Sequence, residues 1–220
     1  MEFNENGFYK HNGNFIEGFI GDDKKSLDEV RLVFILKEPN SGNNEADTFW
    51  FKNTVEGAEN GDKLDRYQNV YYNKLGKIAC LLLGYGDKQK ASALKQCAYI
   101  NLYPVKGGKE ASEQYKKVIE AFKNKDVSND FANSRWDIIN NLPNDCKIIT
   151  VEKIFNAIKI NKTPNNEIIQ KLTIKNNRVD KKFKAFSFNN GKGKIEVYSI
   201  YHPQARGRNS FTAEDIFFNK

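Results

Sequence analysis

Three short segments combine ionisable or amide side chains with a proline beside a run of apolar residues. They are Lys37-Glu38-Pro39-Asn40, Asn101-Leu102-Tyr103 and Tyr201-His202-Pro203-Gln204. A carboxylate such as Glu38 can stabilise a developing positive charge and orient a water molecule, and a histidine such as His202 can stabilise a leaving anion. The amide of Asn101 carries both a hydrogen-bond donor and an acceptor. These side chains suit a site that polarises a bond and recognises a ligand by hydrogen bonds.

The apolar pattern predicts strands that end at these three segments. Strands are expected at 30–37, 97–103, 145–151, 183–188 and 194–201, and helices at 63–83, 88–96, 109–123, 128–142, 152–158 and 212–218. The segment 45–61 is expected to be a loop, and 161–179 has helical character only at its centre. Residues 189–193, Asn-Asn-Gly-Lys-Gly, indicate a hairpin. Alternating strands and helices favour a mostly parallel sheet covered on both faces, with functional residues at the carboxyl ends of the strands.

The order of these segments resembles the motifs of the uracil-DNA glycosylase superfamily. There the first strand ends in Gly-x-Asp-Pro or Gly-x-Asn-Pro, a middle strand ends in asparagine, and the last motif is His-Pro-Ser followed by a wedge side chain. The segments here are Leu36-Lys37-Glu38-Pro39, Tyr99-Ile100-Asn101-Leu102-Tyr103-Pro104 and His202-Pro203-Gln204-Ala205-Arg206. The middle one is most similar to the single-strand-selective branch. The resemblance implies a single domain over residues 1–220, with three α/β/α layers, a central, mostly parallel four-stranded sheet and an added C-terminal hairpin.

The resemblance also implies a role for each matching residue in removing uracil or a related deaminated base from DNA. Glu38 would position water and stabilise the sugar cation, and His202 would stabilise the departing base anion. The residues implied to bind the flipped base are Phe51, which lies twelve residues past the proline, Asn101, Asn40 and Pro39. Trp50 is the alternative to Phe51 for stacking on the base. The residues implied to contact DNA are Arg206 as the wedge, Arg208 and Gln204.

Three positions depart from the family pattern. Glu38 stands where the family has Asp or Asn, Leu36 replaces the opening glycine, and Gln204 replaces the serine of the last motif. These departures keep open a second hypothesis, in which a glycosylase-like fold binds nucleic acid or a nucleotide without cleaving it. A third hypothesis is an α/β protein that acts on an unrelated small molecule.

The distribution of charge is compatible with a nucleic-acid partner, most simply DNA. The net charge is +7, and the segment 153–208 holds 13 Lys/Arg against 3 Asp/Glu. A basic segment on a less basic body is a feature of polyanion-binding proteins, although a solvated lysine-rich surface gives the same pattern.

The remaining composition argues against cofactors and membranes. Cys80, Cys97 and Cys146 form no Cys-x-x-Cys pair, so we expect reduced thiols and neither a metal site nor a metal cluster. No apolar run approaches the roughly 20 residues that span a bilayer. The first residues lack a cationic start followed by an apolar run. We therefore expect a cytoplasmic monomer without a cofactor.

Overall fold

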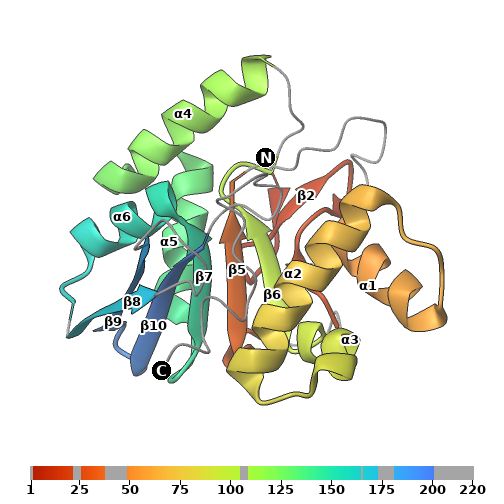
Figure 1. Cartoon of the computed structure of the whole chain (residues 1–220). Coiled ribbons are helices and arrows are strands. Elements are labelled where there is room, and N and C mark those ends of the chain that lie inside the picture. The colour runs from red at the N-terminus through yellow and green to blue at the C-terminus, as the bar shows by residue number, and fades with distance from the viewer. Residues whose placement is uncertain are drawn as a thin grey trace.

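The computed structural model describes residues 2–21, 26–37, 49–104, 109–164, 166–172 and 181–200, which form an α/β fold around a mixed sheet. The sheet has seven strands in the order β4-β6-β5-β7-β10-β9-β8 (Figure 1). Their bounds are β4 Gly18–Phe19, β5 Leu32–Leu36, β6 Cys97–Asn101, β7 Lys147–Val151, β8 Asn166–Leu172, β9 Lys181–Asn189 and β10 Lys194–Ile200. The strands β6, β5, β7 and β10 run parallel, and β4, β9 and β8 pair antiparallel. The α/β class is confirmed, and the sheet is wider than the four strands expected.

The expected hairpin forms between β9 and β10, but it is not an addition to the central sheet. Its second strand, β10, pairs in parallel with β7 and is therefore the fourth strand of the parallel set. The reason lies in the apolar residues of β10, which face both sides of the sheet. Ile195 and Val197 belong to one hydrophobic cluster and Ile200 to the other. A strand buried on both faces is suited to the interior of a sheet rather than to an appendage.

Helices cover both faces of the sheet (Figure 1). Their bounds are α1 Trp50–Asn60, α2 Arg66–Leu83, α3 Lys90–Leu94, α4 Lys109–Asn124, α5 Asp130–Asn141 and α6 Glu152–Asn161, with short 3-10 turns at Leu27–Glu29 and Asp87–Gln89. Apolar residues of α1, α2 and α3 form a cluster with one face of the sheet, and those of α4, α5 and α6 form a cluster with the other. None of the helices in the described segments has the length and apolar character needed to cross a membrane.

The helix α2 illustrates how local sequence sets its boundaries. Asp65 accepts a hydrogen bond from the Gln68 N–H at 2.8 Å, and the Gln68 side chain accepts one from the Asp65 N–H at 3.0 Å. This reciprocal cap satisfies two N–H groups that a helix start would leave unpaired. Gly84 ends the helix with a φ of 76°, a conformation that glycine adopts without steric cost. The expected helix at 63–83 is confirmed, and it begins a few residues later.

The prediction of a loop at 45–61 is wrong for the second part of this segment, because the helix α1 occupies Trp50–Asn60. Its buried residues are Trp50, Phe51, Thr54 and Val55, which lie on one side of a helix at spacings of one, three and four residues. The rest of the helix is polar, glycine or alanine, so the apolar stripe is too short for the pattern to predict a helix. Packing of the first turn against the sheet supplies the missing stabilisation.

The segment 161–179 also differs from expectation, because it contains the strand β8 rather than a helix. This strand pairs antiparallel with β9 from Asn166↔Ser187 to Leu172↔Lys181. The pairing extends the hairpin at the edge of the sheet. Strand formation here depends on pairing with β9, the next strand along the chain, and the residues of 166–172 alone do not reveal that pairing.

The N-terminal segment forms a small three-stranded sheet of β1 Glu2–Phe3, β2 Tyr9–His11 and β3 Asn14–Phe15. Asn12 and Gly13 join β2 to β3 with positive φ angles of 49° and 78°, which suits a two-residue hairpin turn. Phe3 and Tyr9 pack against Phe131 of α5 with ring centroids 5.7 and 5.1 Å away. After β3 the chain continues into β4, which pairs with β6 in the larger sheet.

Candidate functional site

The carboxyl ends of β5, β6 and β10 lie in one row across the sheet. Leu36 is paired with Asn101 between β5 and β6, and Ile200 is paired with Val151 between β10 and β7. The register of β5 with β7 places Val151 level with Leu36. Neighbouring strands lie about 4.8 Å apart, so the end of β5 is about 5 Å from that of β6 and about 10 Å from that of β10. The three sequence motifs therefore follow strands that end at the same edge.

The last side chains of these strands also share a face. Leu36, Tyr99 and Ile200 belong to the cluster that packs against α1, α2 and α3. Asn101 alternates in phase with Tyr99 along β6, so its side chain lies on that face as well. Burial raises the pKa of Tyr99 well above its usual value, and a hydrogen bond with the Asn101 side chain opposes that rise. The candidate site is therefore the α1–α3 side of the carboxyl edge.

Most of the site residues expected from the sequence lie outside the described residues. They are Glu38, Pro39, Asn40, His202, Gln204, Arg206 and Arg208, and the helix expected at 212–218 lies outside them too. The structure describes the other two, Asn101 and Phe51. It places Asn101 at the end of β6 and Phe51 in the first turn of α1.

Asn101 carries a buried acceptor that has no partner in the part of the chain that the structure describes. Its residue surface is only 2 % exposed, and its Oδ1 has no hydrogen-bond partner among the described residues. A buried polar group left in this way costs about 1–3 kcal/mol, so such groups are uncommon in stable proteins. A ligand that brings an N–H donor to Oδ1 would remove that cost.

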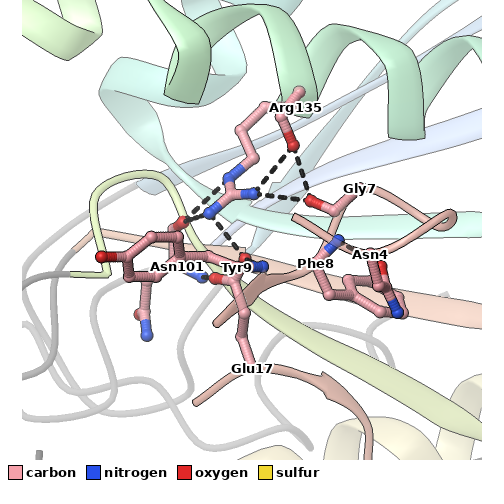
Figure 2. Close-up of polar contacts among 8 residues, drawn as sticks. Asn4, Gly7, Phe8, Tyr9, Glu17, Asn101 and Arg135 are labelled. Atoms are coloured by element: carbon pink, nitrogen blue, oxygen red, sulfur yellow. Dashed lines mark hydrogen bonds and ion pairs between the residues drawn. The ribbon is translucent and has the colours of Figure 1, made fainter. Parts of the chain in front are cut away.

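The main chain of Asn101 is held by two buried charged side chains (Figure 2). Its N–H donates to Glu17 Oε2 at 3.2 Å, and its carbonyl oxygen accepts from Arg135 Nε at 3.1 Å and from Nη2 at 2.9 Å. The neighbouring strand β4 has only two residues and pairs Gly18 with Tyr99. Beyond that pair the edge of β6 has no backbone partner from β4, and the two side chains take its place.

Glu17 and Arg135 also form an ion pair with each other, and we name these two residues the clamp. Arg135 Nη2 lies 2.7 Å from Glu17 Oε1, and both side chains are fully buried. The Tyr9 N–H donates to Glu17 Oε1 at 2.9 Å, and Arg135 Nη1 donates to the Gly7 carbonyl at 3.2 Å. Burial raises the pKa of the Glu17 carboxyl, while the guanidinium and two backbone N–H groups oppose that rise. Burial lowers the pKa of Arg135, and Glu17 opposes that effect.

Phe51 and Trp50 lie in an aromatic cluster under the same face of the sheet. Phe51 is fully buried, and its ring centroid lies 4.9 Å from that of Tyr99 and 5.3 Å from that of Trp50. Trp50 also contacts Tyr67 and Tyr71 at 5.2 and 5.1 Å. The Nε1 of Trp50 is buried and has no hydrogen-bond partner within the described segments. Trp50 is therefore the one of these two residues whose ring carries an N–H without a partner among the described residues.

Sequence patterns alone do not predict the clamp, although Arg135 leaves a signal. In the helix expected at 128–142, Arg135 falls on the same stripe as Phe131 and Ile138, which are buried. A charged residue on an apolar stripe indicates a buried partner of opposite charge. Glu17 gave no comparable signal, because it precedes a strand of two residues and its contact with Asn101 spans 84 positions.

The role of this site is indicated neither by a metal-binding group among the described residues nor by a similar protein. No group of three or more His, Cys, Asp or Glu side chains that could hold a metal ion occurs in the described part of the chain. Comparisons with protein-family models, with curated proteins and with solved structures find no match for this sequence. Any functional conclusion must therefore come from the residues and their arrangement.

Proposed function

We propose that this protein is a metal-independent DNA glycosylase that hydrolyses the N-glycosidic bond of uracil or a related deaminated base. The observation that carries the proposal is the buried Oδ1 of Asn101, which has no partner among the described residues. An imide N–H, such as N3–H of uracil, is the donor that such an acceptor needs. The position at the carboxyl end of a parallel strand is where ligands bind in α/β sheets.

The shared edge of the sheet supports a common site for the catalytic pair. Leu36 and Ile200 end strands at the same edge as Asn101, and Glu38 and His202 each follow one of them by two residues in the sequence. We propose that both act together with Asn101 at this edge. Glu38 then orients the attacking water and stabilises the sugar cation. His202 stabilises the base anion as the bond breaks.

The aromatic cluster would supply the platform for the flipped base. Stacking on an aromatic ring is worth about 1–3 kcal/mol per base, which helps to offset the cost of unstacking. The resemblance assigns stacking to Phe51, but Phe51 is 0 % exposed whereas Trp50 is 8 % exposed. We therefore assign the direct contact to Trp50, with Phe51 behind it. Pro39 and Asn40 complete the base-binding set proposed from the sequence.

Contacts with the DNA strand are assigned to the residues that follow the proposed catalytic histidine. Arg206 would fill the gap left by the flipped base, and Arg208 and Gln204 would contact phosphates. Uneven charge supports this assignment, because 13 of the 35 Lys/Arg residues lie between positions 153 and 208. Binding to DNA should then weaken steeply as salt is added.

The test is release of free base from an oligonucleotide that contains one uracil, assayed on single-stranded and duplex forms. The wild-type protein is expected to release uracil, and Glu38→Gln and His202→Ala are expected to lower the rate by at least about a hundredfold. His11→Ala is the matched control, because His11 is the other histidine of the chain and lies in the N-terminal sheet.

No release from uracil, hypoxanthine or xanthine substrates would refute the proposal. Salt-dependent DNA binding without release would instead support the non-catalytic binding protein that the departures at Leu36, Glu38 and Gln204 suggest. Absence of DNA binding at low salt would leave an unrelated small molecule as the substrate class.

A further inference from the structure

We infer that Glu17 and Arg135 are positioning residues for base recognition, because they fix the main chain of Asn101, from which the side-chain amide projects. The inference rests on the proposed function. Figure 2 shows the guanidinium of Arg135 between the carbonyl groups of Gly7 and Asn101, with Glu17 against it. Neither charged residue is assigned to the reacting groups themselves.

The hydrogen bonds hold the peptide groups on both sides of the Asn101 Cα atom. On one side, the Asn101 N–H donates to Glu17. On the other, the Asn101 carbonyl accepts from Arg135, and the next N–H, that of Leu102, donates to the Leu36 carbonyl at 2.8 Å. With both peptide planes fixed, φ and ψ of Asn101 are fixed as well. Recognition by a single amide requires placement to within about 0.5 Å, which this arrangement favours.

Closing the edge of β6 does not by itself explain a buried ion pair. Two more residue pairs between β4 and β6 would reach Asn101 and could satisfy the same N–H and carbonyl with neutral backbone groups. Two buried charges are costly to desolvate, and such pairs often contribute little net stability compared with apolar residues. The fork of the guanidinium, however, reaches the Asn101 and Gly7 carbonyls at once, which a neutral side chain of similar length cannot do.

The clamp joins three parts of the chain at the candidate site. Glu17 comes from the N-terminal segment and Arg135 from α5, and their contacts with Asn101 span 84 and 34 positions. The position of the Asn101 main chain, and so the point from which its side chain projects, depends on how the N-terminal segment and α5 pack against β6. We expect changes in the clamp to alter recognition of the base even where the protein stays folded.

The test follows the Asn101 side-chain amide by NMR in the whole protein, with its signal assigned by its loss in Asn101→Ala. Glu17→Gln and Arg135→Lys are the variants, because each keeps the size of the side chain but removes a charge or the fork. Ile158→Ala is the matched control, since Ile158 is a fully buried residue of α6 outside the clamp. Arg135→Met serves as a third variant if it folds.

The expected result is a broadened or shifted Asn101 amide signal in Glu17→Gln and Arg135→Lys, with the wild-type signal kept in Ile158→Ala. In the base-release assay, kcat/KM should fall at least about tenfold in both clamp variants, and by less than about twofold in the control, with all proteins folded. An unchanged Asn101 signal in both clamp variants would overturn the inference. If the wild-type protein releases no base, the proposed function fails, and the amide signal alone decides whether the clamp positions Asn101.

Discussion

Replacing Arg135 by methionine should lower the free energy of unfolding by about 3–5 kcal/mol, the usual cost of removing one partner from a buried ion pair. The substitution would leave the Glu17 carboxylate buried without its cation. It would also take both donors from the Asn101 carbonyl, which accounts for about 1–3 kcal/mol of the total. The Gly7 carbonyl keeps the Ser134 hydroxyl as a donor at 2.6 Å and should add little. The loss is a large share of the roughly 5–15 kcal/mol that stabilises most domains.

The measurement is urea unfolding of a double-mutant cycle with Glu17→Met and Arg135→Met. The double variant should be less destabilised than the sum of the single variants by about 1–3 kcal/mol, because the second substitution removes the uncompensated charge. The exposed pair Lys194–Glu196, at 2.8 Å, is the matched control, and its coupling should be about 0.2–1 kcal/mol. Equal coupling in the two cycles, or a loss below about 1 kcal/mol in Arg135→Met, would refute the reasoning.

Three further outcomes are expected. Burial raises the pKa of the Cys146 thiol to about 12, so at pH 8 a thiol reagent should modify it at least about a hundredfold more slowly in native protein than in urea. Burial raises the pKa of Glu196, but hydrogen bonds from a lysine and a tyrosine outweigh it and lower the pKa overall. The charged Glu196 side chain therefore stabilises the fold at pH values above its unfolded pKa of about 4.3, and this stabilisation is lost as the pH falls toward the lower pKa of the folded state. Between about pH 5 and pH 3, the free energy of unfolding in urea should fall less in Glu196→Gln than in the wild-type protein. Gly193→Ala should cost more than about 1 kcal/mol, because φ is 155° and the new methyl would meet the Asn144 side chain. Gly191→Ala also falls at a positive φ, 92°, but the new methyl would meet open space, so it should cost less in the same assay.

The central part of the fold could be predicted because its signals are local. The strand β5 is a run of five fully buried apolar residues, and the stripe of α2 includes Tyr71, Leu75, Ile78 and Ala79. The short strand β6 is likewise a buried run, and β7 is buried at its three central residues. By contrast, α1 has an apolar stripe of one turn, and β8 depends on pairing with β9. Local patterns do not record such partners, so these two elements were interpreted wrongly.

The candidate site likewise has one part that the sequence predicts and another part that it does not. The sequence predicts a strand at 97–103 with Asn101 near its end, and the structure ends β6 at Asn101 itself. The clamp could not be derived, because a glutamate before a two-residue strand and an arginine in a distant helix meet only through the tertiary fold. Leu36, Asn101 and Ile200 lie level with one another because of the register between the strands, and local sequence patterns do not reveal that register.

The measurement that tests the central claim most directly is equilibrium binding of free uracil and of N3-methyluracil by calorimetry. The two ligands differ at the one donor that the Asn101 Oδ1 is proposed to accept. The wild-type protein should bind uracil at least about tenfold more tightly, because N3-methyluracil would leave that oxygen unpaired. In Asn101→Ala the two affinities should become equal within about twofold. Equal binding of both ligands by the wild-type protein, or discrimination that survives in Asn101→Ala, would contradict the account.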